Sequence, residues 1–116
     1  TMIIADPEQM KRVINNIISN SVKYMDKPKG KIDIRLLDEV DSVRIEIEDN
    51  GKGIAAKDLP LIFERFYRVD KSHSKKVNGT GLGLSIVKHI VQSSGAEISV
   101  KSTLGEGSTF TVVFHQ

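Results

Sequence analysis

Three polar side chains in the first predicted helix are of types that bind a metal-bound phosphate. Asn16, Asn20 and Lys23 fall within about 60° of one another when each residue advances a helix by about 100°. An amide oxygen is a hard ligand that suits Mg²⁺, and a lysine ammonium is a point charge for phosphate. Amides and lysines also solvate a helix edge with no further role. Taken alone, the three residues favour that simpler interpretation.

A carboxylate and two glycines follow the second predicted strand. Asp49 comes directly after it, and Gly51 and Gly53 stand close behind. A carboxylate held at a strand end accepts hydrogen bonds from an exocyclic amine, such as that of adenine. Glycine has no Cβ, so it lets the backbone approach a flat ring closely. An ordinary turn would use the same residues, and the pattern alone favours it. The dinucleotide-binding fingerprint is excluded, because the third glycine is missing and no helical period follows directly.

A glycine-rich run, residues 79–83, precedes another predicted helix. Backbone N–H groups at a helix N-terminus suit phosphate oxygens. The run lacks the Gly-Lys-Ser/Thr of a P-loop, and a hinge at the helix start explains it equally well. Residues 62–68 interleave aromatic side chains with Arg65 and Arg68, which either contact phosphate or are solvated. The three histidines show no metal-ligand spacing.

The elements that must position these residues follow from hydrophobic periodicity. Asp6 as N-cap, Pro7 and Glu8 predict the start of the first helix, and Pro28 and Gly30 predict its end. Its apolar face is predicted to carry Met10, Val13, Ile14, Ile17, Ile18, Val22 and Met25.

Alternation then predicts a hairpin of two half-buried strands, the first with Ile32, Ile34 and Leu36, the second with Val43, Ile45 and Ile47. A short helix is expected over residues 58–66 with Asp58 as cap, and a mobile loop over residues 70–80. A helix then carries Leu84, Ile86, Val87, Ile90 and Val91 and closes at Ser94 and Gly95, and two strands follow, with Ile98 and Val100 and with Phe110, Val112 and Phe114. This order predicts an α/β fold in which helices cover one face of a mixed sheet.

Composition narrows the class of protein. The chain has 116 residues, a net charge of +2 and no cysteine, so disulfides, iron–sulfur clusters and thiol nucleophiles are excluded. The near-balanced charge gives no argument for binding nucleic acid or an anionic membrane. We expect one cytoplasmic domain spanning residues 1–116, with no direct membrane contact.

Taken together, in this order and at these distances along the chain, the four groups of residues form a pattern that is specific to one family. Over essentially its whole length the chain resembles the catalytic ATP-binding domain of bacterial sensor histidine kinases. Residues 16–24 are similar to the N box of that family and residues 49–53 to its first glycine box. Residues 63–68 are similar to the F box, and residues 79–84 to the second glycine box.

The resemblance implies the Bergerat fold, a two-layer α/β sandwich shared with gyrase B, a heat-shock chaperone and mismatch-repair ATPases. It implies ATP and Mg²⁺ as ligands, with residues 69–78 as a mobile ATP lid. Asp49 would bind the adenine amino group beside Tyr24, Asn20 would hold Mg²⁺ with Asn16 next to it, and Lys23 would reach a phosphate. Arg65 would lie near the γ-phosphate when a partner helix docks. The other implied ATP-binding positions are Gly51, Gly53, Ile54, Thr80, Gly81, Leu82, Gly83 and Leu84.

The chain lacks the phosphoacceptor of such kinases, a histidine with an acidic neighbour in a separate helical-hairpin domain. His73, His89 and His115 have no such neighbour. The acceptor is therefore expected from another domain of the same parent, with a response regulator downstream. By resemblance, the parent is a membrane-anchored sensor kinase. Because no part of the chain matches the dimerising helices of that family, we expect the domain to be monomeric in isolation.

Three alternatives remain open. The first is a hydrolytic ATPase of the gyrase or chaperone branch. The resemblance implies that this branch has a Glu general base at the position of Asn16, and a carboxamide cannot act as that base. An anti-sigma-factor serine kinase and a degenerate nucleotide-binding module are the others.

Overall fold

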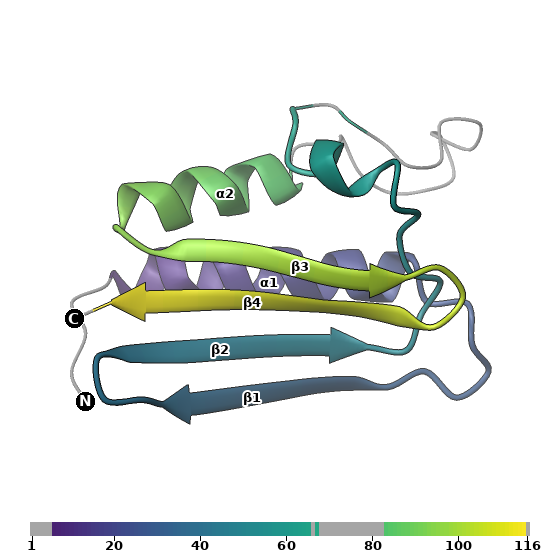
Figure 1. The fold of residues 1–116 in the computed structure, drawn as a ribbon, viewed down its shortest axis with the longest axis horizontal. Helices are drawn as coiled ribbons and strands as arrows, with labels where there is room; N and C mark the ends of the chain where they lie inside the picture. Colours follow the sequence, from purple (N-terminus) through teal and green to yellow (C-terminus); the bar gives the residue numbers. More distant parts are fainter. Residues whose placement is uncertain (1–5, 66, 68–82, 116) are drawn as a thin grey trace.

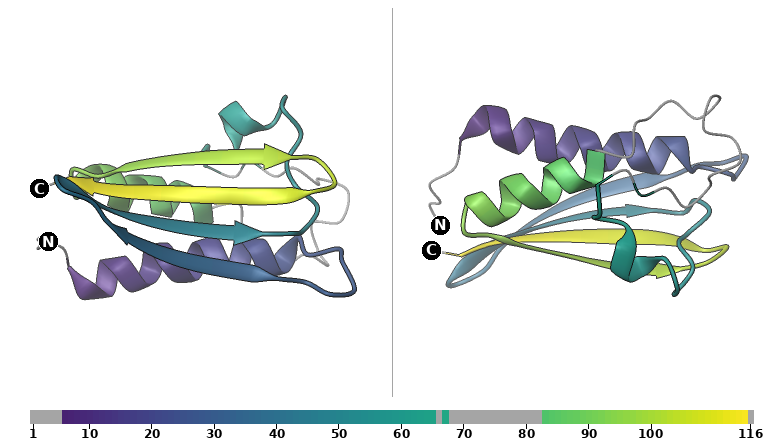
Figure 2. Two further views of the ribbon diagram at one scale, coloured as in Figure 1. Left: turned by 60° about the horizontal axis from the view of Figure 1, so that its bottom comes forward. Right: turned by 90° about the horizontal axis from the view of Figure 1, so that it is seen from above.

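The computed structural model describes residues 6–65, 67 and 83–115, which form a sheet with two α-helices on one side of it (Figures 1 and 2). The right view of Figure 2 shows both helices above the sheet. This is the expected two-layer α/β sandwich. In chain order the elements are α1 (Pro7–Lys23), β1 (Ile32–Asp38), β2 (Ser42–Asp49), the 3₁₀ turn η1 (Leu59–Leu61), α2 (Gly83–Ser93), β3 (Glu97–Thr103) and β4 (Gly107–His115).

The sheet has the strand order β1-β2-β4-β3, and every neighbouring pair is antiparallel. The expectation of a mixed sheet is therefore wrong for the strands that the structure describes. β2 and β3 do run in the same direction, as a connection through a helix predicts. However, β4 turns back from β3 and lies between the two, so these parallel strands never pair.

The core lies between the sheet and the helices. Asp6 caps α1 as predicted, since its side chain accepts a hydrogen bond from the Glu8 amide. Phe110 and Ile17 are fully buried, and burying a side chain of this size stabilises a fold by about 1.5–3 kcal/mol. The buried cluster comprises Val13, Ile17, Ile45, Ile47, Ile54, Ile62, Val87, Ile90, Val91, Ala96, Phe110, Val112 and Phe114.

Two apolar faces differ from prediction. α1 ends at Lys23, before Met25, and its buried stripe is Val13, Ile17 and Ser21, whereas Val22 is 60% exposed. The stripe advances four residues at a time, which turns Val22 about 100° away from the sheet. On β1, Ile34 and Leu36 are 52% and 69% exposed, because β1 is an edge strand of the described sheet.

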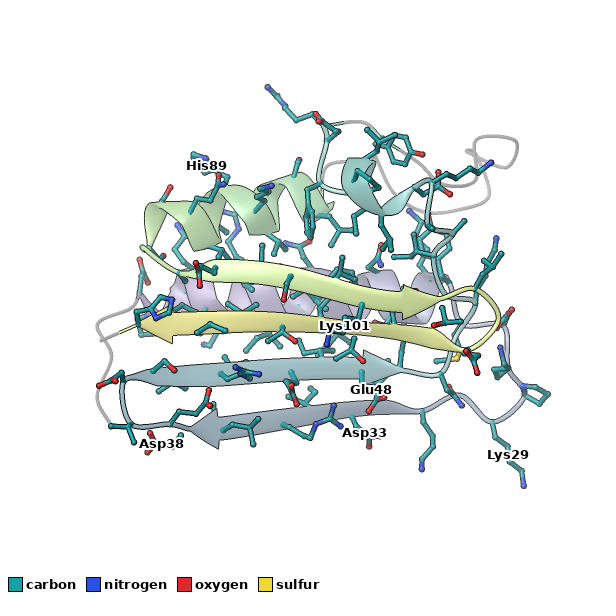
Figure 3. All side chains as sticks on the ribbon, viewed as in Figure 1. Lys29, Asp33, Asp38, Glu48, His89 and Lys101 are labelled. Carbon is teal, nitrogen blue, oxygen red and sulfur yellow. The ribbon has the colours of Figure 1, made fainter. Side chains whose placement is uncertain are left out.

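The opposite face of the sheet is polar. Arg35 on β1 donates hydrogen bonds to Glu46 and Glu48 on β2, both at 3.0 Å. Figure 3 labels Glu48 and also Lys101 of β3. Alternation along each strand sends such residues away from the helices, so this face needs no covering layer.

The helix predicted over residues 58–66 is reduced to η1, a single 3₁₀ turn. Asp58 makes no capping hydrogen bond there and instead accepts one from the Tyr67 hydroxyl. Pro60 lies within the turn and has no N–H to donate to a longer helix. After α2, Gly95 adopts a φ of +71°, which confirms the predicted stop at Ser94 and Gly95.

Candidate functional site

One cavity gathers side chains from both layers at the end of β2. Of the predicted site residues, Asn20, Tyr24, Asp49, Gly53, Ile54 and Leu84 line it. They come from α1, from the end of β2 and the loop that follows, and from the first turn of α2. The cavity is also lined by Ser21, Lys52, Ile62, Tyr67 and Ser108.

Asp49 has both carboxylate oxygens held by donors. The Ser21 hydroxyl donates to Oδ2 over 2.9 Å, and the Gly51 amide donates to Oδ1 over 2.9 Å. Ser108, on the neighbouring strand β4, is the register partner of Asp49. The carboxylate is thus fixed in a cavity wall with acceptor capacity left for a ligand, as a group that recognises an amine requires.

Two glycines allow the backbone segments around Asp49 to meet. Gly53 has a φ of +76°, and a Cβ there would lie 2.2 Å from the Thr103 carbonyl oxygen. Gly107 has a φ of +131°, and its Cβ would lie 2.0 Å from the Asp49 carbonyl oxygen. The chain therefore needs glycine at both positions for packing against its own backbone. This requirement is separate from any approach to a bound ring.

Tyr24 follows α1 and joins the helix to the loop after β2. Its carbonyl accepts a hydrogen bond from the Lys52 amide over 3.1 Å. The Lys23 and Lys52 ammonium groups lie 5.3 Å and 6.0 Å from the centre of its ring. These separations are within the range of cation–π attraction, so two positive charges lie near the ring at the cavity wall.

The F-box segment contacts both layers of the fold, the sheet through Phe110 of β4 and the helices through Lys88 of α2. The Phe63 ring packs edge-on against Phe110, with centroids 6.4 Å apart, and Lys88 of α2 lies 5.4 Å from the Phe63 ring centre. This anchor brings Tyr67 to the cavity, where its hydroxyl bonds to the buried Asp58. The hydrogen bond to Asp58, with burial as a smaller cause, raises the pKa of Tyr67 above its usual value of 10.0.

Several predicted residues lie outside the cavity lining. Asn16 is one helical turn before Asn20; its side-chain amide donates to the Arg12 carbonyl over 2.9 Å, and its Oδ1 faces Gly83 at the start of α2. Gly51 is buried behind Asp49. Lys23 stands beside Tyr24, and Arg65 is exposed. Thr80, Gly81, Leu82 and the expected lid, residues 69–78, lie outside the described residues.

Sequence reasoning missed five residues of the lining, and two of them carried a detectable signal. Ser108 shares the inward face of β4 with Phe110, Val112 and Phe114, so a hydroxyl stands where alternation predicts a core residue. Ser21 likewise continues the buried stripe of Val13 and Ile17. Lys52, Ile62 and Tyr67 reach the cavity through loop geometry that periodicity does not encode.

The donor set fits a hard cation held mainly by a nucleotide. Within the described ranges, no cluster of three or more His, Cys, Asp or Glu side chains could hold a metal ion. Mg²⁺ is commonly bound by few protein oxygens together with substrate phosphates. The Asn20 amide, at the cavity wall, could supply one such oxygen. None of the described helices is long and apolar enough to span a membrane.

The sequence and the fold have counterparts among known proteins. A family model described as "Histidine kinase-, DNA gyrase B-, and HSP90-like ATPase" matches residues 5–116. The chain belongs to this family, and it is homologous to the catalytic domains of sensor histidine kinases.

Individual relatives support the same assignment. The chain is 42% identical to the sensor histidine kinase WalK of Bacillus subtilis over 109 residues, which cover 91% of this chain and 18% of WalK. A structure of the mycobacterial sensor histidine kinase MprB superposes with a TM-score of 0.84 at 30% identity, covering 97% of this chain and 76% of that one. Full-length ShkA in complex with AMPPNP gives a TM-score of 0.80 at 28% identity, with 97% and 22% covered. The chain thus spans about a fifth of the length of WalK.

Proposed function

We propose that this domain binds Mg·ATP and transfers the γ-phosphoryl group to a histidine of a separate phosphoacceptor domain. The observation that carries the proposal is the fixed carboxylate of Asp49 in the same cavity as Asn20 and Tyr24. A carboxylate acceptor, an aromatic wall and an amide oxygen match an adenine, its sugar and a metal-bound phosphate respectively. AMPPNP in the ShkA structure supports this choice of ligand.

Each residue has a role in this proposal. Asp49 accepts a hydrogen bond from the adenine amino group, and Tyr24 packs beside the base or sugar. Asn20, with Asn16 next to it, offers amide oxygen to Mg²⁺, and Lys23 contacts a phosphate. Backbone amides from the run that includes Gly81 and Gly83 contact the phosphates. When bound, Mg²⁺ supplies positive charge against the phosphate oxygens, and phosphoryl transfer needs mainly such neutralisation and positioning.

The acceptor histidine belongs to another domain. Transfer forms a bond between the unprotonated ring nitrogen of the histidine and the γ-phosphorus and breaks the bond from that phosphorus to the β–γ bridging oxygen. ADP leaves with this oxygen, and the other ring nitrogen releases its proton to solvent. Arg65 is exposed, so we assign it to the γ-phosphate in the docked complex. We further propose that the parent is a membrane-anchored sensor with this domain in the cytoplasm, and that it passes the phosphoryl group to a response regulator.

A mixing experiment tests the transfer. The domain is incubated with γ-labelled ATP, Mg²⁺ and a purified helical-hairpin phosphoacceptor domain, and the expected result is acid-labile label on the hairpin. Replacing the acceptor histidine by Gln should remove it. Asn20→Ala should reduce the label and weaken Mg²⁺-dependent nucleotide binding more than Mg²⁺-free ADP binding. Label on serine, which is acid-stable, would instead identify a serine kinase.

The second function, a hydrolytic ATPase, is disfavoured by one observation. By resemblance, the hydrolytic branch has a glutamate base at the position of Asn16. Here the side chain is an amide, and its nitrogen already donates to the Arg12 carbonyl. We therefore expect negligible ATP turnover by the domain alone. A turnover equal to that of gyrase-type ATPases would contradict the proposal, and the absence of any adenine-dependent binding would identify a degenerate module.

A further inference from the structure

Ser21 is a buried polar residue on the core-facing stripe of α1. Its relative exposure is 2%, the same as that of Val13 and close to the 0% of Ile17 in the same stripe. A hydroxyl at a core position lowers stability unless it is hydrogen-bonded. The bond that Ser21 makes is to Asp49, 28 residues away in the sequence.

The geometry of that bond constrains the Asp49 carboxylate. Ser21 Oγ lies 2.9 Å from Oδ2, and the Gly51 amide nitrogen lies 2.9 Å from Oδ1. The two donors come from different elements, one from α1 and one from the loop after β2. With one donor on each oxygen, rotation about the last side-chain bond would break at least one hydrogen bond. The orientation of the remaining lone pairs is therefore fixed.

We propose that Ser21 is a positioning residue that sets the selectivity of the site for a purine bearing a 6-amino group. The proposal rests on the proposed function, since it assumes that Asp49 receives that amino group. Ser21 acts through Asp49: it donates its hydrogen to Oδ2 and so presents the carboxylate to the cavity that Ser21 itself helps to line. Without the hydroxyl, the Gly51 amide alone orients the carboxylate, which can turn and bind water.

The test compares two nucleotides and two serine variants of the same helix. AMPPNP carries the 6-amino group, and purine riboside triphosphate lacks it. Ser21→Ala should bind AMPPNP about threefold to tenfold more weakly, the effect of losing one hydrogen bond, while its affinity for purine riboside triphosphate stays unchanged. Ser19→Ala, at an exposed position of α1, should change neither affinity. Titration calorimetry and displacement measure both constants.

The ratio of the two affinities separates positioning from a structural role. A merely destabilising substitution would weaken both nucleotides equally, so an unchanged ratio in a folded Ser21→Ala overturns the inference. If Ser21→Ala does not fold, Ser21→Cys, with a weak S–H donor of similar size, is measured in its place, and the ratio should again fall. Wild-type protein that binds neither nucleotide would overturn the proposed function itself. Normal selectivity that survives the loss of the hydroxyl would overturn this inference alone.

Discussion

Two regions of the proposed site are built in different ways. At the first, the Asp49 end, α1, the loop after β2 and the β3–β4 hairpin meet: Ser21 and Gly51 hold the carboxylate, and Gly107 packs against the Asp49 backbone. The second, the helix edge, comprises Asn16, Asn20 and Lys23 of the single helix α1, of which Asn20 lines the cavity. The Asp49 end exists only when the whole fold is assembled, whereas the geometry of the helix edge follows from one helix.

Because of this difference, we expect substitutions in the two regions to change stability and nucleotide binding in different proportions. A substitution at the Asp49 end disturbs contacts among several elements, so we expect it to change both the free energy of unfolding and nucleotide affinity. A substitution on the helix edge, such as Asn20→Ala, removes a proposed ligand group from a helix that the core already holds. There we expect binding to change much more than stability.

Gly107→Ala should have the largest effect and tests the Asp49 end directly. The new Cβ would lie 2.0 Å from the Asp49 carbonyl oxygen at a φ of +131°, so β4 must move away from Asp49. We expect a loss of about 3 kcal/mol in the free energy of unfolding, measured by urea denaturation. Gly105→Ala is the control, since Gly105 also has a positive φ but nothing within 4 Å, and should cost about 1 kcal/mol. Equal losses would mean that this contact does not constrain the site.

Asp49→Asn should have the next largest effect and act mainly on the choice of base. The Gly51 amide donates to Oδ1, so the oxygen of the new amide will take that position and its NH₂ will point toward Ser21 and the cavity. A donor then faces the donor of the adenine amino group. We expect a loss of about 1.5–3 kcal/mol in ATP binding and of the preference over GTP, measured by calorimetry. Retained adenine preference would remove Asp49 from base recognition.

Much of the helix edge was predictable from sequence, because helical periodicity alone places Asn16, Asn20 and Lys23 on one side of α1. The cap at Asp6 and the hairpin of β1 and β2 are confirmed for the same reason: local signals determine them. The positions of Ser21 and Ser108 in the cavity wall were not predictable. Each depends on which distant backbone lies opposite, and the sequence pattern gave only a polar residue at a core position.

The sheet shows the same limit. Alternation identified four strands but not their order, and the position of β4 between β2 and β3 removed the expected parallel pairing. In the described sheet β1 pairs with β2 alone, and on this edge strand the exposure of Ile34 and Leu36 exceeds the prediction for a half-buried strand. Pairing of distant strands is a tertiary property, so periodicity within one strand does not determine it.

Lys27→Ala should have a smaller effect on the free energy of unfolding, and it tests whether Lys27 belongs to the contacts that stabilise the Asp49 end. The Lys27 ammonium donates to the carbonyls of Gly51 and Gly105, at 3.2 Å and 2.9 Å, and so joins the loop after β2 to the β3–β4 hairpin. We expect a loss of about 1 kcal/mol in the free energy of unfolding. Lys29→Ala, at the exposed position labelled in Figure 3, is the control and should change little. Equal free energies of unfolding for the two variants would mean that the contacts of Lys27 do not stabilise the Asp49 end.

Tyr67→Phe should have the smallest effect at neutral pH and a distinctive dependence on pH. The hydrogen bond to Asp58 raises the pKa of Tyr67 above 10.0 in the folded protein, so the folded state holds this proton more tightly than the unfolded state does. The stabilisation is therefore fully present below the unfolded pKa of about 10 and is lost as the pH rises through the higher folded pKa. Urea midpoints at pH 8 and above pH 10 measure this contribution. The urea midpoint of the wild type should be higher than that of Tyr67→Phe at pH 8, and the gap between the two midpoints should shrink as the phenol ionises. The absence of a gap at pH 8 would show that Tyr67 stabilises the cavity wall by the packing of its ring, which Phe retains, and that the Asp58 contact contributes nothing.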